Sequence, residues 1–218
     1  MREKTKAHIR YKNANGEIVP GVTTVLGILN KPALVKWANN LGLQGIDSSR
    51  YRDEMADIGT LVHYLVMCEL TGQTPVTADY SPNQLEMAEN ATLSYYEWAK
   101  GHTIEPILVE EALVSDQYGY GYGGTVDLYA AVDGVKTLVD FKTGKAIYPE
   151  MVYQLAAYKH LLLSNGYELA QARILRIGRD ADEGFEEKVV NGLEREWAIF
   201  AHCLGIYNLQ KAIKKGGN

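Results

Sequence analysis

The spacing of apolar residues divides the chain into helical and extended segments. Apolar positions recur at helical intervals in five stretches, which predict helices over 22–43, 51–70, 83–100, 148–164 and 193–214. Within the first stretch, Thr23 or Thr24 is expected to cap one helix and Pro32 to start a second, short one that runs through Trp37. Alternating or continuous apolar runs predict strands over 104–115, 172–178 and 185–190, and a short hairpin over 8–19.

The stretch from Gly124 to Lys145 has the clearest hairpin pattern. It reads GTVDLYAAVDGVKTLVDFKTGK, and its Asp133-Gly134 dipeptide favours a type I′ turn. If no bulge interrupts the pairing, counting outward from the turn places 131 opposite 136 and then 129 opposite 138. The next step outward places Asp127 opposite Asp140, so two carboxylates are expected to face each other.

Side chains alternate across a strand, so this register sorts the hairpin into two faces. The apolar face, expected to be core, consists of Val126, Leu128, Ala130, Val132, Val135, Thr137, Val139 and Phe141. The other face consists of Asp127, Tyr129, Ala131, Lys136, Leu138, Asp140 and Lys142. Opposed like charges repel, so a cation is expected between the acids, either Lys142 or a divalent metal with oxygen ligands. The alternative is a solvated strand face with a surface lysine.

Length and composition limit the organisation of the chain. Its 218 residues, 46% of them hydrophobic, suffice for one globular domain over 1–218. Its expected parts are a helical part over about 20–100, a sheet and helix over about 104–190, and a closing helix over about 193–214. The net charge of −5 is mildly acidic, so a nucleic-acid partner would have to meet a local patch.

Cysteine usage and hydropathy indicate a reducing compartment. Cys68 and Cys203 are far apart in apolar helical surroundings, which excludes a disulfide framework and any four-cysteine iron–sulfur site. No apolar signal segment and no apolar stretch of membrane-spanning length is visible. We therefore expect a cytoplasmic protein without a membrane partner.

Several polar residues outside the hairpin are candidates for chemistry. His63 lies on the predicted helix 51–70, one turn after Gly59, although a lone helical histidine is more often structural. Glu110 and Glu111 interrupt an apolar strand, so one is expected to face a site and the other solvent. The alternative is that both lie at an exposed strand edge.

The run QYGYGYGG, residues 117–124, alternates tyrosine with glycine. Tyr118, Tyr120 and Tyr122 could stack on unpaired bases, because every base offers a face to an aromatic ring. The alternative is a simple turn that leads into the hairpin.

Four short segments in this order resemble the PD-(D/E)xK nuclease superfamily. They are IGTLVH (58–63), GTVD (124–127), VDFKTGK (139–145) and QLAAY (154–158), within about 22–163 of the chain. The resemblance is to the RecB-like exonuclease branch, which includes CRISPR-associated RecB-like nucleases, the mitochondrial genome maintenance exonuclease and phage exonucleases. It implies a restriction-endonuclease-like α/β (α+β) core, with a central mixed sheet flanked by helices.

The resemblance also implies roles for individual residues. The metal ligands would be Asp127, Asp140, His63, the backbone carbonyl of Phe141 and, on the preceding strand, Glu110. Lys142 would be the catalytic lysine, acting with the two aspartates and Gln154. Tyr158, one helical turn after Gln154, would lie beside the site. The candidate DNA-binding residues are Tyr158, Lys145 and, from the tyrosine–glycine run, Tyr120 and Tyr122.

The expected activity is metal-dependent hydrolysis of DNA phosphodiesters, by an exonuclease that leaves 5′-phosphates. The metal would be Mg²⁺ or Mn²⁺, a histidine ligand favouring manganese, and no iron–sulfur cluster is expected. Single-stranded DNA or duplex ends are the expected substrate, with a recombinase or single-strand-binding protein as a further partner. The implied setting is recombination, repair or phage DNA processing in a bacterial or phage-infected cell. The alternatives are an endonuclease of the same fold and a non-catalytic DNA-binding or regulatory module.

Overall fold

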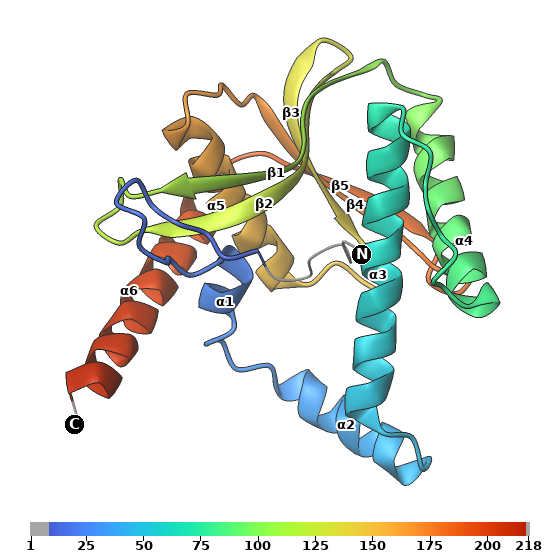
Figure 1. Ribbon diagram of the computed structural model, residues 1–218, viewed down its shortest axis with the longest axis horizontal. Coiled ribbons are helices and arrows are strands. Elements are labelled where there is room, and N and C mark those ends of the chain that lie inside the picture. The colour runs from blue at the N-terminus through green and yellow to red at the C-terminus, as the bar shows by residue number, and fades with distance from the viewer. Residues whose placement is uncertain (1–8, 217–218) are drawn as a thin grey trace.

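The computed structural model describes residues 9–216, which form a five-stranded mixed sheet with helices against both faces (Figure 1). The strands lie in chain order, and β3 and β4 pair in parallel while the other neighbours are antiparallel. The strands are β1 (Ile104–Ser115), β2 (Tyr122–Val132), β3 (Val135–Lys142), β4 (Gln171–Ile177) and β5 (Phe185–Val190). The helices are α1 (Val22–Leu26), α2 (Pro32–Leu43), α3 (Ser48–Thr71), α4 (Pro82–Ala99), α5 (Pro149–Ser164) and α6 (Glu194–Gly216). The predicted α+β class with a central mixed, restriction-endonuclease-like sheet is confirmed.

The hairpin of β2 and β3 forms as the turn dipeptide predicts. Asp133 has φ 52° and Gly134 has φ 80°, the two left-handed residues that a type I′ turn requires. The regular pairing runs through Val132↔Val135, Ala131↔Lys136, Ala130↔Thr137, Tyr129↔Leu138 and Leu128↔Val139. The register is therefore the predicted one, but the regular ladder ends one step before Asp127 and Asp140.

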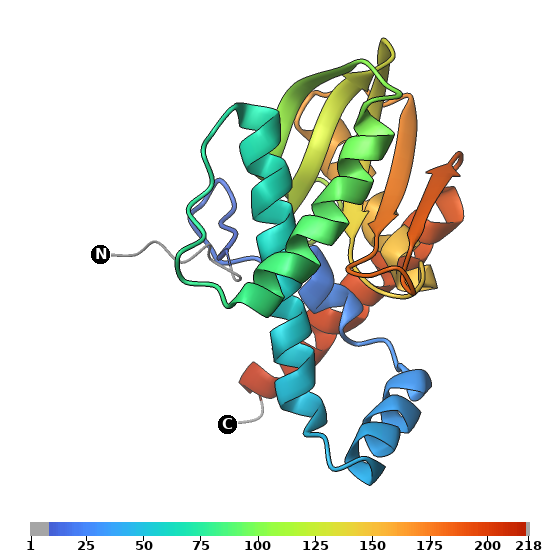
Figure 2. The same cartoon turned by 90° about the vertical axis from the view of Figure 1, so that its right-hand side faces the viewer.

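Two hydrophobic cores lie on opposite faces of the sheet. One is formed with α1, α5 and α6, and the other with α3 and α4 (Figure 2). The parallel pairing of β3 with β4 requires a crossover, and α5 supplies it. The sheet is therefore covered on both sides, and most of the predicted polar face of the hairpin is buried, although Lys136 beside the turn is exposed.

The hairpin does not present one continuous core face, which corrects the prediction. Val126 packs in the core of α1, α5 and α6, whereas Leu128 and Val132 pack in the core of α3 and α4. Tyr129, predicted on the polar face, is buried in the first core. The side of β2 that meets each core reverses at Asp127, where β2 has no regular bridge to β1 or to β3. Strict alternation assumes an uninterrupted strand, and β2 is interrupted here.

The helix ends follow local capping rules in part. The Asp47 carboxylate caps α3 by accepting hydrogen bonds from the backbone N–H groups of residues 49 and 50, and Gly72 ends the helix with φ 67°. The predicted threonine caps are wrong, because Gly21 is the N-cap of α1 and makes no side-chain cap. Helix α2 also runs on to Leu43 rather than ending near Trp37.

Three further expectations concern the ends and the general character of the chain. The predicted N-terminal hairpin begins at residue 8, which lies outside the described residues; its remainder forms a single bridge between Lys12 and Ile18. Cys68 and Cys203 are free and buried. Within 9–216, no helix is long and apolar enough to cross a membrane.

Candidate metal centre

Three carboxylates lie in a row across neighbouring strands. The pairs Val109↔Leu128 and Glu111↔Val126 place Glu110 of β1 opposite Asp127 of β2. The pair Leu128↔Val139 places Asp140 of β3 on the other side of Asp127. Neither ladder contains a regular bridge at this row, which coincides with the reversal of β2 between the two cores.

The backbone at this row departs from regular strand geometry. Glu110 has φ 49°, a left-handed conformation that is uncommon for a residue other than glycine and that costs free energy. On the other side, the backbone N–H of Phe141 donates to Asp127 Oδ2 at 2.8 Å. The regular pairing of β2 with both neighbouring strands is thus interrupted where the acids converge.

Helix α3 supplies a histidine to the row. His63 Nδ1 lies 3.1 Å from Glu110 Oε1 and 3.5 Å from Asp127 Oδ1. One ligand atom from each of these three residues lies within 4.8 Å of the others, an arrangement that could hold a metal ion. The edge of the imidazole also contacts the ring of Phe141, with the ring centroids 6.1 Å apart, which fixes its orientation. Glu111, by contrast, is exposed.

Asp140 lies beside this three-residue group and is paired differently. It is fully buried, and its Oδ2 lies 2.6 Å from Lys142 Nζ. Its Oδ1 has no hydrogen-bonding partner within the part of the chain that the structure describes. A buried carboxylate oxygen without a donor is costly, and a hard divalent cation satisfies such an atom. The donor set therefore fits Mg²⁺ or Mn²⁺, with the backbone of Phe141 adjacent.

The charged groups at the site shift one another's pKa values. Burial, then the charge of Asp127, raises the pKa of Asp140 to about 6 although Lys142 opposes the shift. Burial would also raise the pKa of Asp127, but the charge and hydrogen bond of His63 outweigh it and lower that pKa. Burial alone would lower the pKa of His63, but the charges and hydrogen bonds of Asp127 and Glu110 outweigh burial and raise this pKa to about 10. For Lys142 the acids likewise outweigh burial and raise the pKa, so the ammonium stays charged. Neighbouring carboxylates with opposite pKa shifts are typical of active sites.

Helix α5 packs behind the row through a glycine. Gln154 Nε2 donates to Tyr158 Oη at 2.7 Å, and Tyr158 is buried. A Cβ at Gly124 would lie 2.5 Å from Tyr158 Cε1, so only glycine allows this helix to approach β2 so closely. Burial, then the charges of Asp127 and Asp140, raises the pKa of Tyr158 well above its usual value. Tyr158 thus packs behind the site from α5, and its buried ring is not accessible to a base.

The tyrosine run is mostly structural. Tyr122 is fully buried and donates its hydroxyl to the carbonyl of Ala157, which excludes the predicted stacking on a base. Tyr118 packs against Trp197 with their ring centroids 4.5 Å apart. Tyr120 is 42% exposed, and Lys145, three residues after Lys142, is exposed, so both side chains are accessible to a ligand.

Two positioning contacts were not foreseen from the sequence. A Cβ at Gly59 would lie 3.1 Å from Thr143 Oγ1, so the bare helix backbone lets α3 approach the loop after Lys142. The buried Arg176 donates to the carbonyl of Gly144 at 3.3 Å and holds the same loop from β4. The glycine four residues before His63 was the one sequence signal for the first contact; the second had none.

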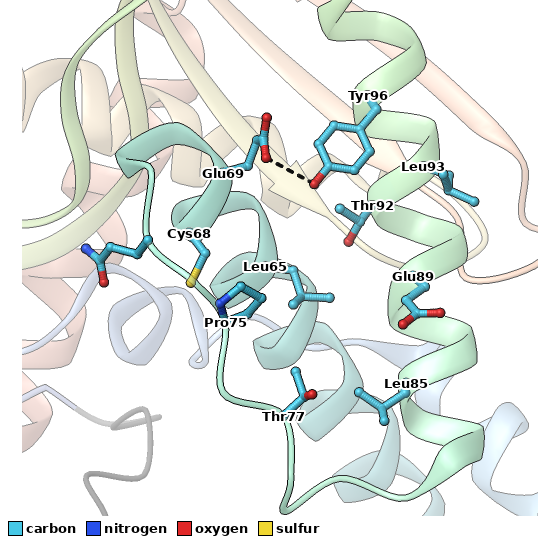
Figure 3. Close-up of a pocket in the computed structure, with 11 residues that line it drawn as sticks. Leu65, Cys68, Glu69, Pro75, Thr77, Leu85, Glu89, Thr92, Leu93 and Tyr96 are labelled. Carbon is cyan, nitrogen blue, oxygen red and sulfur yellow. Dashed lines mark hydrogen bonds between the residues drawn. The ribbon is translucent and has the colours of Figure 1, made fainter.

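A separate cavity lies between α3, α4 and the segment that joins them (Figure 3). It encloses about 380 Å³ and includes none of the residues of the acid row. Its walls are largely apolar, with Tyr96 donating to Glu69 at 3.3 Å. The cavity is therefore not part of the candidate metal centre.

Fold and site together define a class: an α+β protein of restriction-endonuclease-like architecture whose mixed sheet carries a carboxylate and histidine cluster. No family model and no curated protein matches the sequence. Among solved structures, the chain is similar to a candidate exonuclease from Eubacterium rectale, with TM-score 0.53 and 14% identity over 73% of this chain and 68% of that one. The alkaline exonuclease of Laribacter hongkongensis aligns more loosely, with TM-score 0.37 and 15% identity over 91% and 95% of the two chains. The first likeness establishes a shared fold.

Proposed function

We propose that this protein is a metal-dependent DNA nuclease of the PD-(D/E)xK superfamily, in its RecB-like exonuclease branch. The observation that carries the proposal is the convergence of His63, Glu110 and Asp127 beside the buried Asp140–Lys142 pair. A purely structural ion pair would leave no buried acceptor unused, whereas Asp140 Oδ1 has no partner among the described residues. The candidate exonuclease that shares the fold is a further support.

The residues divide the work of phosphodiester hydrolysis. His63, Glu110, Asp127 and Asp140 would hold Mg²⁺ or Mn²⁺, with the Phe141 carbonyl as a further ligand. The bound ion would polarise the phosphodiester and lower the pKa of water. Lys142, held charged by Asp140, would orient the attacking water and offset negative charge that develops on the phosphoryl oxygens. Gln154 and Tyr158 would keep this arrangement in place from α5. Water attack on phosphorus, with departure of the 3′ oxygen, leaves a 5′-phosphate and a 3′-hydroxyl.

Cleavage of labelled linear and closed circular DNA, in Mn²⁺, Mg²⁺ or chelator, tests the proposal. The wild type is expected to cleave linear DNA only with metal. Asp140→Asn is expected to be inactive, and Lys142→Met is expected to be slowed about 10²- to 10³-fold. Glu111→Gln is the matched control, because this exposed glutamate adjoins Glu110 on β1 and should leave activity unchanged.

Each outcome discriminates between functions. Equal cleavage by all four proteins would reject a nuclease at this site. Cleavage of circular DNA would indicate an endonuclease, and metal-independent DNA binding without cleavage would favour a regulatory module. End-labelled substrates of both polarities, single-stranded and duplex, would then define the direction. A role in recombination, repair or phage DNA processing, beside a recombinase or single-strand-binding protein, is part of the same proposal.

A further inference from the structure

The N-terminal segment lies directly on β2, next to the acid row. The backbone N–H of Gly123 donates to the carbonyl of Pro20 at 3.0 Å, and Gly21 forms a parallel bridge with Gly123. The ring of Tyr11 lies against Gly123 so closely that any Cβ there would overlap it. The glycines of the QYGYGYGG run therefore seat a tyrosine from a distant part of the chain.

This contact brings two hydroxyl groups together. Tyr11 Oη and Thr125 Oγ1 lie 3.0 Å apart, although the residues are 114 positions apart in sequence. Both side chains are partly exposed. Thr125 precedes Asp127 by two residues on β2, so the hydroxyl pair lies near the acid row, about 6.5 Å along the strand at regular strand spacing.

The hydroxyl pair has an unused donor. Two hydroxyls carry two hydrogens, and their mutual bond uses one of them. Neither hydroxyl makes another hydrogen bond within residues 9–216. Tyr11 also lies close enough to contribute to the raised pKa of Tyr158, after burial and the two aspartates. A free donor at the edge of a metal site fits an acceptor on the substrate rather than on the protein.

We infer that Tyr11 and Thr125 form a subsite that binds a phosphate of the DNA strand adjacent to the phosphate being cleaved. Phosphate oxygens are acceptors only, and tyrosine and threonine hydroxyls are common phosphate contacts in protein–DNA complexes. The subsite is neutral, so it tolerates the nearby carboxylates without forming an ion pair that would compete with the metal. It positions the strand and takes no part in the chemistry. The inference rests on the proposed nuclease function.

Tyr11→Phe and Thr125→Val test the subsite with minimal change. Phenylalanine keeps the ring that packs on Gly123, and valine keeps the shape of threonine, so each variant removes only a hydroxyl. We expect KM for linear DNA to rise about 2- to 10-fold in each, the effect of one hydrogen bond, with kcat within twofold. The double variant should be no worse than about the stronger single one, because both hydroxyls serve one contact. Tyr96→Phe, which removes a hydroxyl beside the α3–α4 cavity, should leave KM unchanged.

Salt dependence and binding separate the subsite from its alternatives. A neutral contact releases no counterion, so the slope of log KM against log salt should be unchanged in Tyr11→Phe, whereas Lys145→Ala should reduce it. Fluorescence anisotropy in an Asp140→Asn background measures DNA affinity without cleavage. Comparison of 5′-phosphorylated and 5′-hydroxyl ends shows whether the subsite holds the terminal phosphate or an internal one.

The outcomes distinguish this inference from the proposed function. Unchanged KM and affinity in both hydroxyl variants, with an active wild type, would overturn the subsite alone. A lowered melting temperature with unchanged KM would show that the pair only fastens the N-terminal segment, which also overturns it. A wild type that neither cleaves nor binds DNA would overturn both the subsite and the nuclease.

Discussion

Replacement of Asp140 by asparagine is expected to stabilise the metal-free protein and to abolish cleavage. Asp140 is fully buried, and its pKa is raised from 3.8 to about 6. Between these values the folded state binds more protons than the unfolded state, so this group lowers stability as pH rises through that window. Two pKa units correspond to about 3 kcal/mol, which the ionised carboxylate costs above pH 6. Asparagine resembles the protonated acid in shape and carries no charge.

The net gain is smaller than that upper value. The amide must find new partners, and Lys142 loses its 2.6 Å contact although Asp127 remains near it. We therefore expect Asp140→Asn to raise the free energy of unfolding by about 1–2 kcal/mol at pH 8, since an imperfect polar replacement costs roughly 1 kcal/mol. For a chain of this size that corresponds to roughly 2–8 °C in Tm.

Urea and thermal unfolding in chelator, from pH 4 to 8, measure this effect. The difference between variant and wild type should be largest at pH 8 and should shrink toward pH 4, where Asp140 is protonated in the folded state and the cost of a buried charge is gone. Addition of Mn²⁺ should raise the Tm of the wild type by more than that of Asp140→Asn. Glu111→Gln, an exposed neighbour, should stay within about 0.5 kcal/mol at every pH. A metal-free Asp140→Asn protein less stable than wild type at pH 8 would refute the claim that this carboxylate is held at a cost.

Three further outcomes follow from the structure. Lys142→Met should lower kcat about 10²- to 10³-fold, as loss of one preorganised electrostatic group does, measured in single-turnover cleavage with Glu111→Gln as reference. Gly124→Ala should lower stability by roughly 1–3 kcal/mol in urea unfolding, because its Cβ would lie 2.5 Å from the Tyr158 ring. Burial, then the charge of Lys159, lowers the pKa of His160 to about 4. As pH falls from 6.5 to 4 the unfolded state takes up the proton and the folded state does not, so stability should be lost over this range. The difference between 6.5 and about 4 corresponds to about 3.4 kcal/mol, and because His160 is only half-buried, solvent screening should reduce the loss to about 2 kcal/mol or less. A His160→Phe protein, which keeps the stack on Trp197, should lose that part of the pH dependence.

The predictable part of the fold depends on local rules. The Asp133-Gly134 turn alone determined the register through Leu128↔Val139, because a two-residue hairpin leaves no freedom in pairing. The reversal of β2 at Asp127 accompanies the loss of regular bridges to both neighbouring strands and the packing of distant helices into two cores. Alternation in one strand contains no information about either, so the predicted continuous core face was wrong.

In the candidate site, too, the contacts within the hairpin could be predicted from the sequence, whereas contacts between distant segments could not. The spacing of Asp127, Asp140 and Lys142 predicted their proximity, and the Lys142 contact with Asp140 follows from side chains two residues apart on one strand face. The contact between His63 and Glu110 joins residues 47 apart and came only from resemblance. The expectation that Tyr122 contacts DNA was wrong. A tyrosine between glycines has the same sequence pattern whether its ring is buried or exposed, so the pattern could not show that Tyr122 is buried. The assignment of catalytic, metal and DNA-binding roles stays a prediction until the variants are measured.

The position of the acid row explains how carboxylates can be both shielded and usable. Within either core they would lose their charge, and on an open strand face water would weaken their hold on a cation. At the reversal of β2 the two cores separate, the ladders lose their bridges, and Glu110 adopts a left-handed backbone, so the acids lie between the cores. Among the described residues, the buried side-chain atoms without a hydrogen-bond partner belong to Asp140 in this row. A metal at about one hundred times its Kd contributes about 2.7 kcal/mol to stability, which is comparable with the roughly 3 kcal/mol that ionised Asp140 costs. The destabilisation of the metal-free protein by ionised Asp140 is therefore similar in size to the stabilisation that metal binding can supply.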